Sequence, residues 1–535
     1  MSHLILYNGK LHTQDPDYPQ ATAVAIRDRR ILAVGRDAEI EPLAGPNTQT
    51  IDLKGRLVLP GLTDCHIHFL EYALRRSQVI LDGVDNWQEV QRRIRAGVER
   101  ADPGEWVLGG GWNQNLWGDG TLPSKADLDD ISPQNPVALS RIDGHSLWVN
   151  SLALEKADIT VETPDPPQSR IDRDPDSGEP TGILREWEAI RLVQDIVPEP
   201  DDETVVTALR ESITEAHRSG LTSIHEMQVE GEKKPALRAF LRLRQRGELL
   251  LRVACMIPVE HLDEAIVLGL GSGLGDATLR IGGIKLFADG SMGSGTAWML
   301  EPFEGSDDNY GVAVTPKDEL RALAYRAHSA DISLAIHAIG DRALHDVLDV
   351  LTEIQGGQPS TLRHRIEHVQ CIQPNDVHRL AQLGVIASMQ PPHIMDDWAV
   401  ADRVWGRRGR YAYAFRSLLD AGTHLAFGSD CPVAPLNPLL GIQAAVLRQD
   451  RKGKPEGGWY PGERLTVAEA VRGYTLGAAY AVGLEDMLGS ITPGKLADMV
   501  VLSRDIFTIP PEEISDTQVD YTILDGQVVY HRGDE

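Results

Sequence analysis

Two histidines one residue apart follow an apolar segment early in the chain. In residues 57–68 a Pro-Gly break is followed by a short apolar run that ends in His66-x-His68. If this run is a strand, its side chains alternate between two faces, so Asp64, His66 and His68 share one face. Two imidazoles placed in this way can bind one metal ion, because each offers a nitrogen at roughly 2.0–2.1 Å from zinc. The same pair also occurs in surface turns, so a metal site requires further ligands.

The ends of other predicted strands supply further candidate ligands. They are His225 and Glu226, Lys285, His337, His368 and Asp430. A single histidine at a strand end is more often a hydrogen-bonded polar residue than a ligand, but a set of this size favours a metal centre. Imidazole and carboxylate ligands suit zinc, and iron, nickel and manganese are also compatible with them.

Eight apolar segments alternate with helical patterns between residues 59 and 485. The segments are Leu62–His68, Leu221–Met227, Leu250–Pro258, Arg280–Ala288, Ser333–Ile339, His364–Gln370, Gly384–Gln390 and His424–Asp430. Eight strand–helix units predict an α/β fold of the TIM-barrel type, (β/α)8. In that fold the catalytic groups lie at the C-terminal ends of the strands, which is where the candidate ligands are placed.

The two ends of the chain predict short strands separated by turns. Residues 1–58 contain a strand that meets Asn8-Gly9, a hairpin signal, and residues 486–535 contain two strands around Asp525-Gly526. Neither end has enough strands for an independent domain. We therefore expect one small β-sandwich domain assembled from both termini, with the metal-dependent barrel of residues 59–485 inserted between them.

The interval between the first two barrel strands, residues 70–205, is too long for a loop. A structureless connection of that size is implausible inside a compact domain. We expect an inserted subdomain that lies over the barrel mouth and shapes the substrate pocket.

The motifs of this chain resemble those of the metal-dependent amidohydrolase superfamily, in the branch that includes N-substituted formamide deformylases. The resemblance covers nearly the whole length of the chain. The motifs that carry it are His66-x-His68, Gly283-Ile284-Lys285 leading to Asp289-Gly290-Ser291, Ile336-His337-Ala338, Glu367-His368, Gly428-Ser429-Asp430, and the closing run of residues 489–498.

The resemblance implies a centre with two metal ions, which we expect to be zinc, and its ligands are carried over position by position. His66, His68 and Asp430 would bind the more buried ion, and His337 and His368 the second. Lys285, carbamylated by carbon dioxide, would bridge the two. An unmodified ammonium among metal cations is strongly disfavoured, so Lys285 is neutral, carbamylated, or outside the site with its head in water.

The expected reaction is hydrolysis of a non-peptide amide C–N bond, in an N-substituted formamide or another small N-acyl amide. A metal-bridging hydroxide attacks the carbonyl carbon, with Asp430 as general base and then general acid. Two alternatives remain open. One is a heterocyclic amine deaminase that uses a single metal ion on the same barrel, and the other is an amidohydrolase-like binding protein without activity.

Several residues outside the ligand set are candidates for substrate binding. They are Trp112, Asn113, Arg141, His145, His225, Asp289 and Met292. Trp112 and Trp117 fit a substrate pocket or the core of the insertion equally well. His145, supported by Asp143 or Arg141, is placed to hydrogen-bond a polar group of the substrate. His225 matches no ligand position of the family, so we expect it to support the ligands or to line the pocket.

Composition excludes several classes of partner. The 535 residues carry a formal net charge of -27, which repels nucleic acid and anionic membranes. No apolar run approaches the roughly 20 residues that span a bilayer, and four dispersed cysteines argue against a disulfide framework. We expect a cytoplasmic enzyme with a small-molecule substrate. The oligomeric state is left open, with a homodimer as the default assembly.

Overall fold

The computed structural model describes residues 2–19, 21–76, 78–117, 121–141, 145–167, 169–229 and 235–534. The chain forms two compact units. Unit 1 consists of Met1–Phe69 and Ile213–Glu535, and unit 2 consists of Leu70–Ser212. Asp143, which was expected to support His145, lies outside the described residues.

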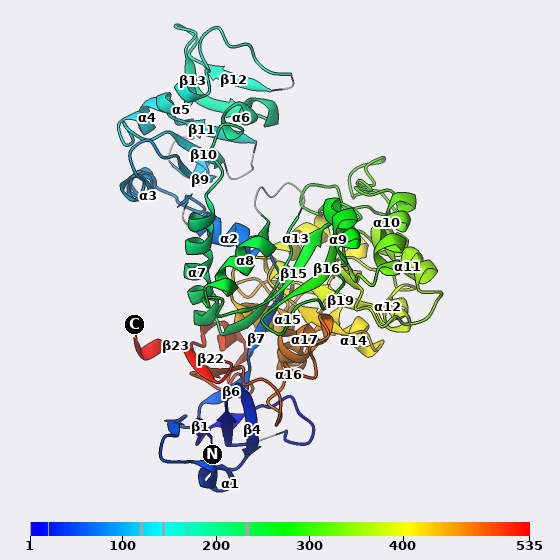
Figure 1. Cartoon of the computed structure of the whole chain (residues 1–535). Coiled ribbons are helices and arrows are strands. Elements are labelled where there is room, and N and C mark those ends of the chain that lie inside the picture. The colour runs from blue at the N-terminus through cyan, green and yellow to red at the C-terminus, as the bar shows by residue number, and fades with distance from the viewer. Residues whose placement is uncertain are drawn as a thin grey trace. The chain divides into compact units, whose positions relative to one another are not determined.

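Unit 1 contains a sheet of eight strands in the order β20-β19-β18-β17-β16-β15-β14-β7 (Figure 1). The strands are β7 (Leu62–Ile67), β14 (Leu221–Glu226), β15 (Arg252–Pro258), β16 (Leu279–Phe287), β17 (Leu334–Ala338), β18 (Arg365–His368), β19 (Ile386–Met389) and β20 (Leu425–Phe427). Every neighbouring pair is parallel. Strands of such sheets are covered on both faces, which explains why they were visible in the sequence as nearly continuous apolar runs.

The first and last strands of this sheet meet and make it a nearly closed barrel. The backbone N–H of Asp430 donates to the carbonyl of His66 at 2.7 Å, and that of His68 donates to Cys431 at 2.9 Å. Asp64 adds a side-chain bond across the same seam, since its Oδ2 accepts from the Ser429 hydroxyl at 2.5 Å. The seam therefore lies at the predicted ligand residues.

Helices follow most barrel strands. In unit 1 they are α8 (Ala236–Gln245), α9 (Leu262–Leu268), α10 (Lys317–Ser329), α11 (Asp341–Ile354), α12 (Val377–Leu383), α13 (Ile394–Trp405), α14 (Phe415–Asp420), α15 (Pro438–Leu447), α16 (Val467–Arg472) and α17 (Ala478–Ala481). α11 shows why they form: Leu344, Val347, Leu348 and Leu351 recur at helical spacing and are all buried. Among the described residues, no helix is long and apolar enough to cross a bilayer.

Two small sheets are built from the ends of the chain, shown in blue and red in Figure 1: one uses N-terminal strands, and the other combines strands from both ends. One has the order β4-β3-β1-β5, from β1 (Leu4–Tyr7), β3 (Ala23–Arg27), β4 (Arg30–Gly35) and β5 (Gln49–Asp52). The other has the order β2-β6-β21-β22-β23, from β2 (Lys10–Leu11), β6 (Leu57–Pro60), β21 (Met499–Leu502), β22 (Val519–Leu524) and β23 (Gln527–His531). Leu6 and Val24 of the first sheet share one core with Val58, Met499 and Val501 of the second.

One predicted turn is wrong and a similar one is correct. Asp525-Gly526 joins β22 and β23 as an antiparallel hairpin, with both residues at positive φ. Asn8-Gly9 connects β1 to β2 but does not form a hairpin, because β1 pairs with β3 and β5 while β2 pairs with β6. Burying β1 between two strands therefore overrides the local turn signal.

Unit 2 is built on a six-stranded sheet of its own. Its order is β12-β13-β11-β10-β9-β8, from β8 (Val79–Ile80), β9 (Val107–Trp112), β10 (Val137–Arg141), β11 (Ser146–Val149), β12 (Arg170–Arg173) and β13 (Pro180–Arg185). Its helices include α3 (Trp87–Arg100), α4 (Lys125–Asp129), α5 (Ser151–Lys156) and α6 (Trp187–Gln194). The predicted fold class is confirmed: a (β/α)8 barrel, a small β-sandwich from both termini, and a large insertion after the first barrel strand.

Candidate metal centre and active-site cavity

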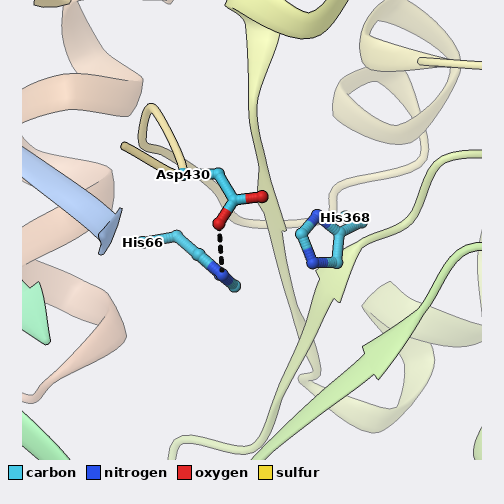
Figure 2. Close-up of side chains that lie close together, drawn as sticks. All are labelled: His66, His368 and Asp430. Atoms are coloured by element: carbon cyan, nitrogen blue, oxygen red, sulfur yellow. Dashed lines mark ion pairs between the residues drawn. The ribbon is translucent and has the colours of Figure 1, made fainter. Parts of the chain in front are cut away.

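Three predicted ligands converge at one end of the barrel. His66 of β7, His368 of β18 and Asp430, which follows β20, each place a ligand atom within 4.8 Å of the others (Figure 2). Asp430 Oδ1 lies 3.4 Å from His66 Nε2 and 3.2 Å from His68 Nε2. The rings of His368 and His337 lie 4.5 Å apart between centroids. All four predicted histidine ligands and Asp430 thus belong to one cluster.

Three of these histidines use one ring nitrogen to hydrogen-bond a protein acceptor. His66 donates from Nδ1 to Glu367 at 2.6 Å, His368 from Nδ1 to Gln390 Oε1 at 2.8 Å, and His337 from Nε2 to the Gly290 carbonyl at 2.9 Å. The acceptors fix the tautomers, so the other nitrogen of each ring is left with a lone pair. This arrangement is the one that metal-binding histidines need.

Burial keeps two of these imidazoles, those of His337 and His368, neutral. It lowers the pKa of His337 to about 3, assisted by the positive charge of Lys285. It also lowers the pKa of His368 well below its ordinary value, with nearby His337 and His66 adding to the effect. Burial acts to raise the pKa of Asp430, but its close contacts with His66 and His68 outweigh burial and hold that pKa well below the usual range. His337 and His368 are therefore neutral nitrogen donors beside an ionised carboxylate.

Lys285 lies in the same cluster and is only 2% exposed. Its Nζ is 4.8 Å from the centroid of the Phe287 ring, two residues along β16. Burial lowers its pKa to about 8, although Glu367 and Asp430 act in the opposite direction. A lysine with a lowered pKa carries a larger fraction of neutral amine, and this is the form that reacts with carbon dioxide.

A cavity of about 460 Å³ opens over the cluster. It is lined by His66, His68, Lys285, Phe287, Ser291, Met292, Gly293, His337, Ile339, His368, Gln370, His393, Asp396, Asp397, Asp430, Val433 and Ala434. Every predicted metal ligand is among them, and so is Met292 from the predicted substrate set. All of these residues belong to unit 1.

A buried pair of opposite charges, Arg365 and Glu367, lies next to the candidate ligands. Arg365 donates from Nε to Glu367 Oε1 at 2.5 Å, and Glu367 in turn accepts from His66. Arg365 also donates from Nη1 to His225 Nδ1 at 2.9 Å. Since arginine can only donate, His225 accepts at Nδ1 and burial holds its pKa well below the ordinary value. His225 is thus connected to His66 through two hydrogen-bonded residues, Arg365 and Glu367.

Asp289 holds the loop that follows β16. Its carboxylate accepts from the backbone N–H groups of Trp298, Ile339 and Gly340 at 2.8, 3.0 and 2.8 Å. The side chain is completely buried, and burial raises its pKa to about 7. These contacts indicate a role in fixing the loop rather than in touching substrate.

The remaining predicted substrate residues belong to unit 2. Trp112 is fully buried, and its indole N–H donates to Leu139 at 2.8 Å, which places it in the core of that unit. Arg141 donates to Gln114 at 3.0 Å, and neighbouring Asn113 is partly buried. His145 is exposed, and its Nδ1 hydrogen-bonds Glu186 at 2.9 Å. Trp117 also packs against the core of unit 2.

Sequence reasoning missed His393, which lines the cavity after the seventh barrel strand. Its Nε2 lies 3.8 Å from Asp430 Oδ2, and its ring stacks over that of His368 with centroids 6.4 Å apart. Gln370 and Asp397 were also missed. The strand-end rule that found the ligands would have found His393, because Pro391-Pro392-His393 directly follows β19.

Two of the candidate ligands have a backbone conformation that is costly for residues other than glycine. His368 has a φ of 72° and Asp430 a φ of 61°, and the β-branched Val369 has a φ of 43°. Such conformations cost of order 1–3 kcal/mol each and concentrate at functional sites. Here they turn the ends of β18 and β20 so that both side chains enter the cluster.

The residues present fit a divalent metal ion. His66 Nε2 is buried, has no hydrogen-bond partner in the described part of the chain, and faces a carboxylate oxygen. A lone pair and a carboxylate oxygen repel each other unless a cation lies between them. Nitrogen and carboxylate donors of this kind suit zinc.

The fold and this cluster agree with the comparisons to known proteins. Residues 49–530 match the amidohydrolase family, and the chain belongs to that family. A metal-dependent hydrolase of Pyrococcus furiosus has a similar crystal structure, with a TM-score of 0.78, 30% sequence identity, and coverage of 94% of this chain and 100% of the other.

Two curated relatives span almost the whole chain. Protein LONG AFTER FAR-RED 3 of Arabidopsis thaliana is 36% identical over 99% of this chain and 92% of its own length. The N-substituted formamide deformylase of Arthrobacter pascens is 29% identical over 99% of each chain. The protein is thus a metal-dependent hydrolase of the amidohydrolase family.

Proposed function

We propose that the protein hydrolyses the C–N bond of a non-peptide amide, either an N-substituted formamide or another small N-acyl amide. The observation that carries this proposal is the position of Lys285, which is buried in the same cavity as His66, His68, His337, His368 and Asp430. A neutral amine at this position is suited to carbamylation, and the resulting carboxylate would bridge two zinc ions. The relative from Arthrobacter pascens, an N-substituted formamide deformylase, supports the choice of substrate class.

His66, His68 and Asp430 would hold one ion, and His337 and His368 the other. Bound zinc ions would supply a hydroxide near neutral pH and would polarise the substrate carbonyl. The protein's own contribution is the placement of these ligands by Glu367, Gln390 and the Gly290 carbonyl.

The two carboxylate oxygens of Asp430 face different groups. Its Oδ1 faces His66 and His68, while Oδ2 faces His393 across the cavity. Oδ2 is therefore the atom placed to accept the proton of the attacking water and to deliver it to the leaving nitrogen. The low pKa of this carboxylate keeps it ionised at neutral pH.

A one-metal deaminase of heterocyclic amines on the same barrel is the alternative. The observation in its favour is that only His66, His368 and Asp430, among the residues described, bring three ligand atoms within 4.8 Å. Such a site would hold one ion and would not use Lys285.

Metal content separates the two functions. We would measure bound zinc in the wild type, in Lys285→Ala and in Lys452→Ala, which removes an exposed lysine as a control. The proposal expects about two ions per chain, falling to one or none in Lys285→Ala only, together with turnover of simple formamides. One ion in all three proteins, and turnover of heterocyclic amines alone, would establish the alternative.

A further inference from the structure

A carboxylate is held in place in the part of the cavity lined by α13. Asp397 Oδ2 accepts from the Tyr413 hydroxyl at 2.5 Å and from Gln370 Nε2 at 2.7 Å. Tyr413 is buried, and Gln370 also donates to the Tyr413 hydroxyl at 2.5 Å. Both bonds to Asp397 fall on Oδ2, and within the described residues Oδ1 accepts none. Asp397 lines the cavity, so it is a fixed acceptor for a ligand there.

The charges around the cavity favour a cationic ligand. Besides the candidate ligand Asp430, the carboxylates of Asp396 and Asp397 line it, whereas Lys285 supplies the only ammonium and no arginine lines it in the described part of the chain. In the proposed function Lys285 is a carbamylated metal ligand, so it offers no ammonium group to a substrate. The net charge of -27 adds a long-range field that attracts cations. A substrate with a free carboxylate, such as an N-acyl amino acid, would meet only repulsion at this end.

His393 connects the reacting end of the cavity with Asp397. It precedes Asp397 by four residues, a spacing that brings side chains to about 5–6 Å between Cβ atoms on one face of a helix. Its Nε2 is buried, has no hydrogen-bond partner among the described residues, and lies 3.8 Å from Asp430 Oδ2. A ligand that extends from Asp430 past His393 therefore reaches Asp397 over a length of roughly one helical turn, about 5 Å.

We propose that the substrates of the proposed amidohydrolase are N-acyl or N-formyl diamines, whose distant ammonium group binds to Asp397. This inference rests on the proposed function. The reaction joins the amide to one water, breaks the C–N bond, and releases a carboxylate and an ammonium: RCONHR′ + H2O gives RCOO⁻ and R′NH3⁺. The second nitrogen of R′ stays protonated and bound at Asp397 throughout.

Three formamides of matched length test the proposal. N-formylputrescine ends in an ammonium, N-pentylformamide ends in a methyl group, and N-formyl-δ-aminovalerate ends in a carboxylate. With zinc-loaded wild-type enzyme we expect kcat/KM for N-formylputrescine to exceed that for N-pentylformamide by about 10- to 100-fold, the value of one charge-assisted hydrogen bond. The carboxylate compound should be the poorest of the three.

Asp397→Asn should remove most of this preference, because the amide keeps the bonds from Tyr413 and Gln370 but loses the charge. The control is Asp318→Asn, which removes one negative charge from a side chain that is 93% exposed and should leave the preference intact. Equal kcat/KM for N-formylputrescine and N-pentylformamide in the wild type would overturn the inference and leave the proposed function standing.

Binding of free putrescine provides a readout that does not depend on turnover. Calorimetry should show putrescine binding more tightly than pentylamine to the wild type, with the difference lost in Asp397→Asn. If this holds while none of the formamides is hydrolysed, the diamine site is supported and the proposed function fails. Equal binding of the two amines would count against the site.

Discussion

Glu367 Oε2 lies 2.6 Å from His66 Nδ1, and both side chains are completely buried. Glu367 is also paired with Arg365, whose attraction is the main reason that its pKa lies well below the usual range even though burial opposes this. The contact fixes the tautomer of the first predicted ligand. It also places a buried ion pair directly behind the metal centre.

Glu367→Gln should weaken metal binding and reduce stability together. Loss of a carboxylate that orients a histidine ligand typically lowers metal affinity about 10–100-fold. The substitution also leaves Arg365 buried without a counter-charge, which costs about 3–5 kcal/mol. Zinc titration against a chelator and urea unfolding of the metal-free protein measure the two effects. Glu353→Gln, at an exposed pair with Arg321, should change stability by about 0–1 kcal/mol and leave zinc affinity unaltered.

Asp430→Asn should lower kcat on a formamide substrate by about 10²–10⁴-fold, the range of a general acid–base group. The reason is that an amide cannot accept and return the proton at Oδ2. Initial rates at saturating substrate give the result, and Asp420→Asn, at an exposed side chain, serves as the control. Turnover at the wild-type rate in Asp430→Asn would exclude the proposed role.

Gly428→Ala should disturb the barrel seam. A Cβ at this position would lie 2.5 Å from the His66 backbone nitrogen and 2.6 Å from Asp64 Oδ1, closer than real Cβ contacts allow. Forcing the strands apart costs about 1–3 kcal/mol and displaces His66. The melting temperature and the zinc content should both fall. Gly462→Ala, where nothing lies within 4 Å, should leave both unchanged.

His217 should make the protein less stable in weak acid. It is buried, its Nε2 donates to Leu250 at 2.6 Å, and burial lowers its pKa from 6.5 to about 4. Between pH 6.5 and 4, His217 binds a proton in the unfolded chain but stays neutral in the folded chain. The free energy of unfolding therefore decreases as pH falls through this window. The loss amounts to roughly 3 kcal/mol. Urea unfolding across this range should be flatter in His217→Gln than in the wild type or in His378→Gln, an exposed control. Parallel curves for all three would contradict the assignment.

The barrel strands were predictable because burial on both faces leaves long apolar runs in the sequence. Leu221–Glu226 and Leu62–Ile67, for example, begin where they were predicted and end one residue earlier. The convergence of the candidate ligands was predictable for a related reason, since a parallel barrel brings the C-terminal ends of all its strands to one rim.

The supporting network could not be predicted in the same way. Arg365 and His225 are 140 positions apart, and Glu367 and His66 are 301 positions apart. Nothing local marks a charged residue within a strand as the partner of a distant histidine. Asp397 gave no signal either, because its importance depends on Tyr413, which comes from a later segment of the chain.

The seam between the first and last barrel strands also dictates when the metal centre can form during synthesis. Asp64 and Ser429 are 365 positions apart, and the candidate ligands His66 and Asp430 lie beside them. Nearly the entire barrel must therefore be synthesised before His66 and Asp430 can come together. The protein must acquire its metal late, after the eighth strand has emerged, and a nascent chain that stalls before that strand carries histidines without the carboxylate that completes their site.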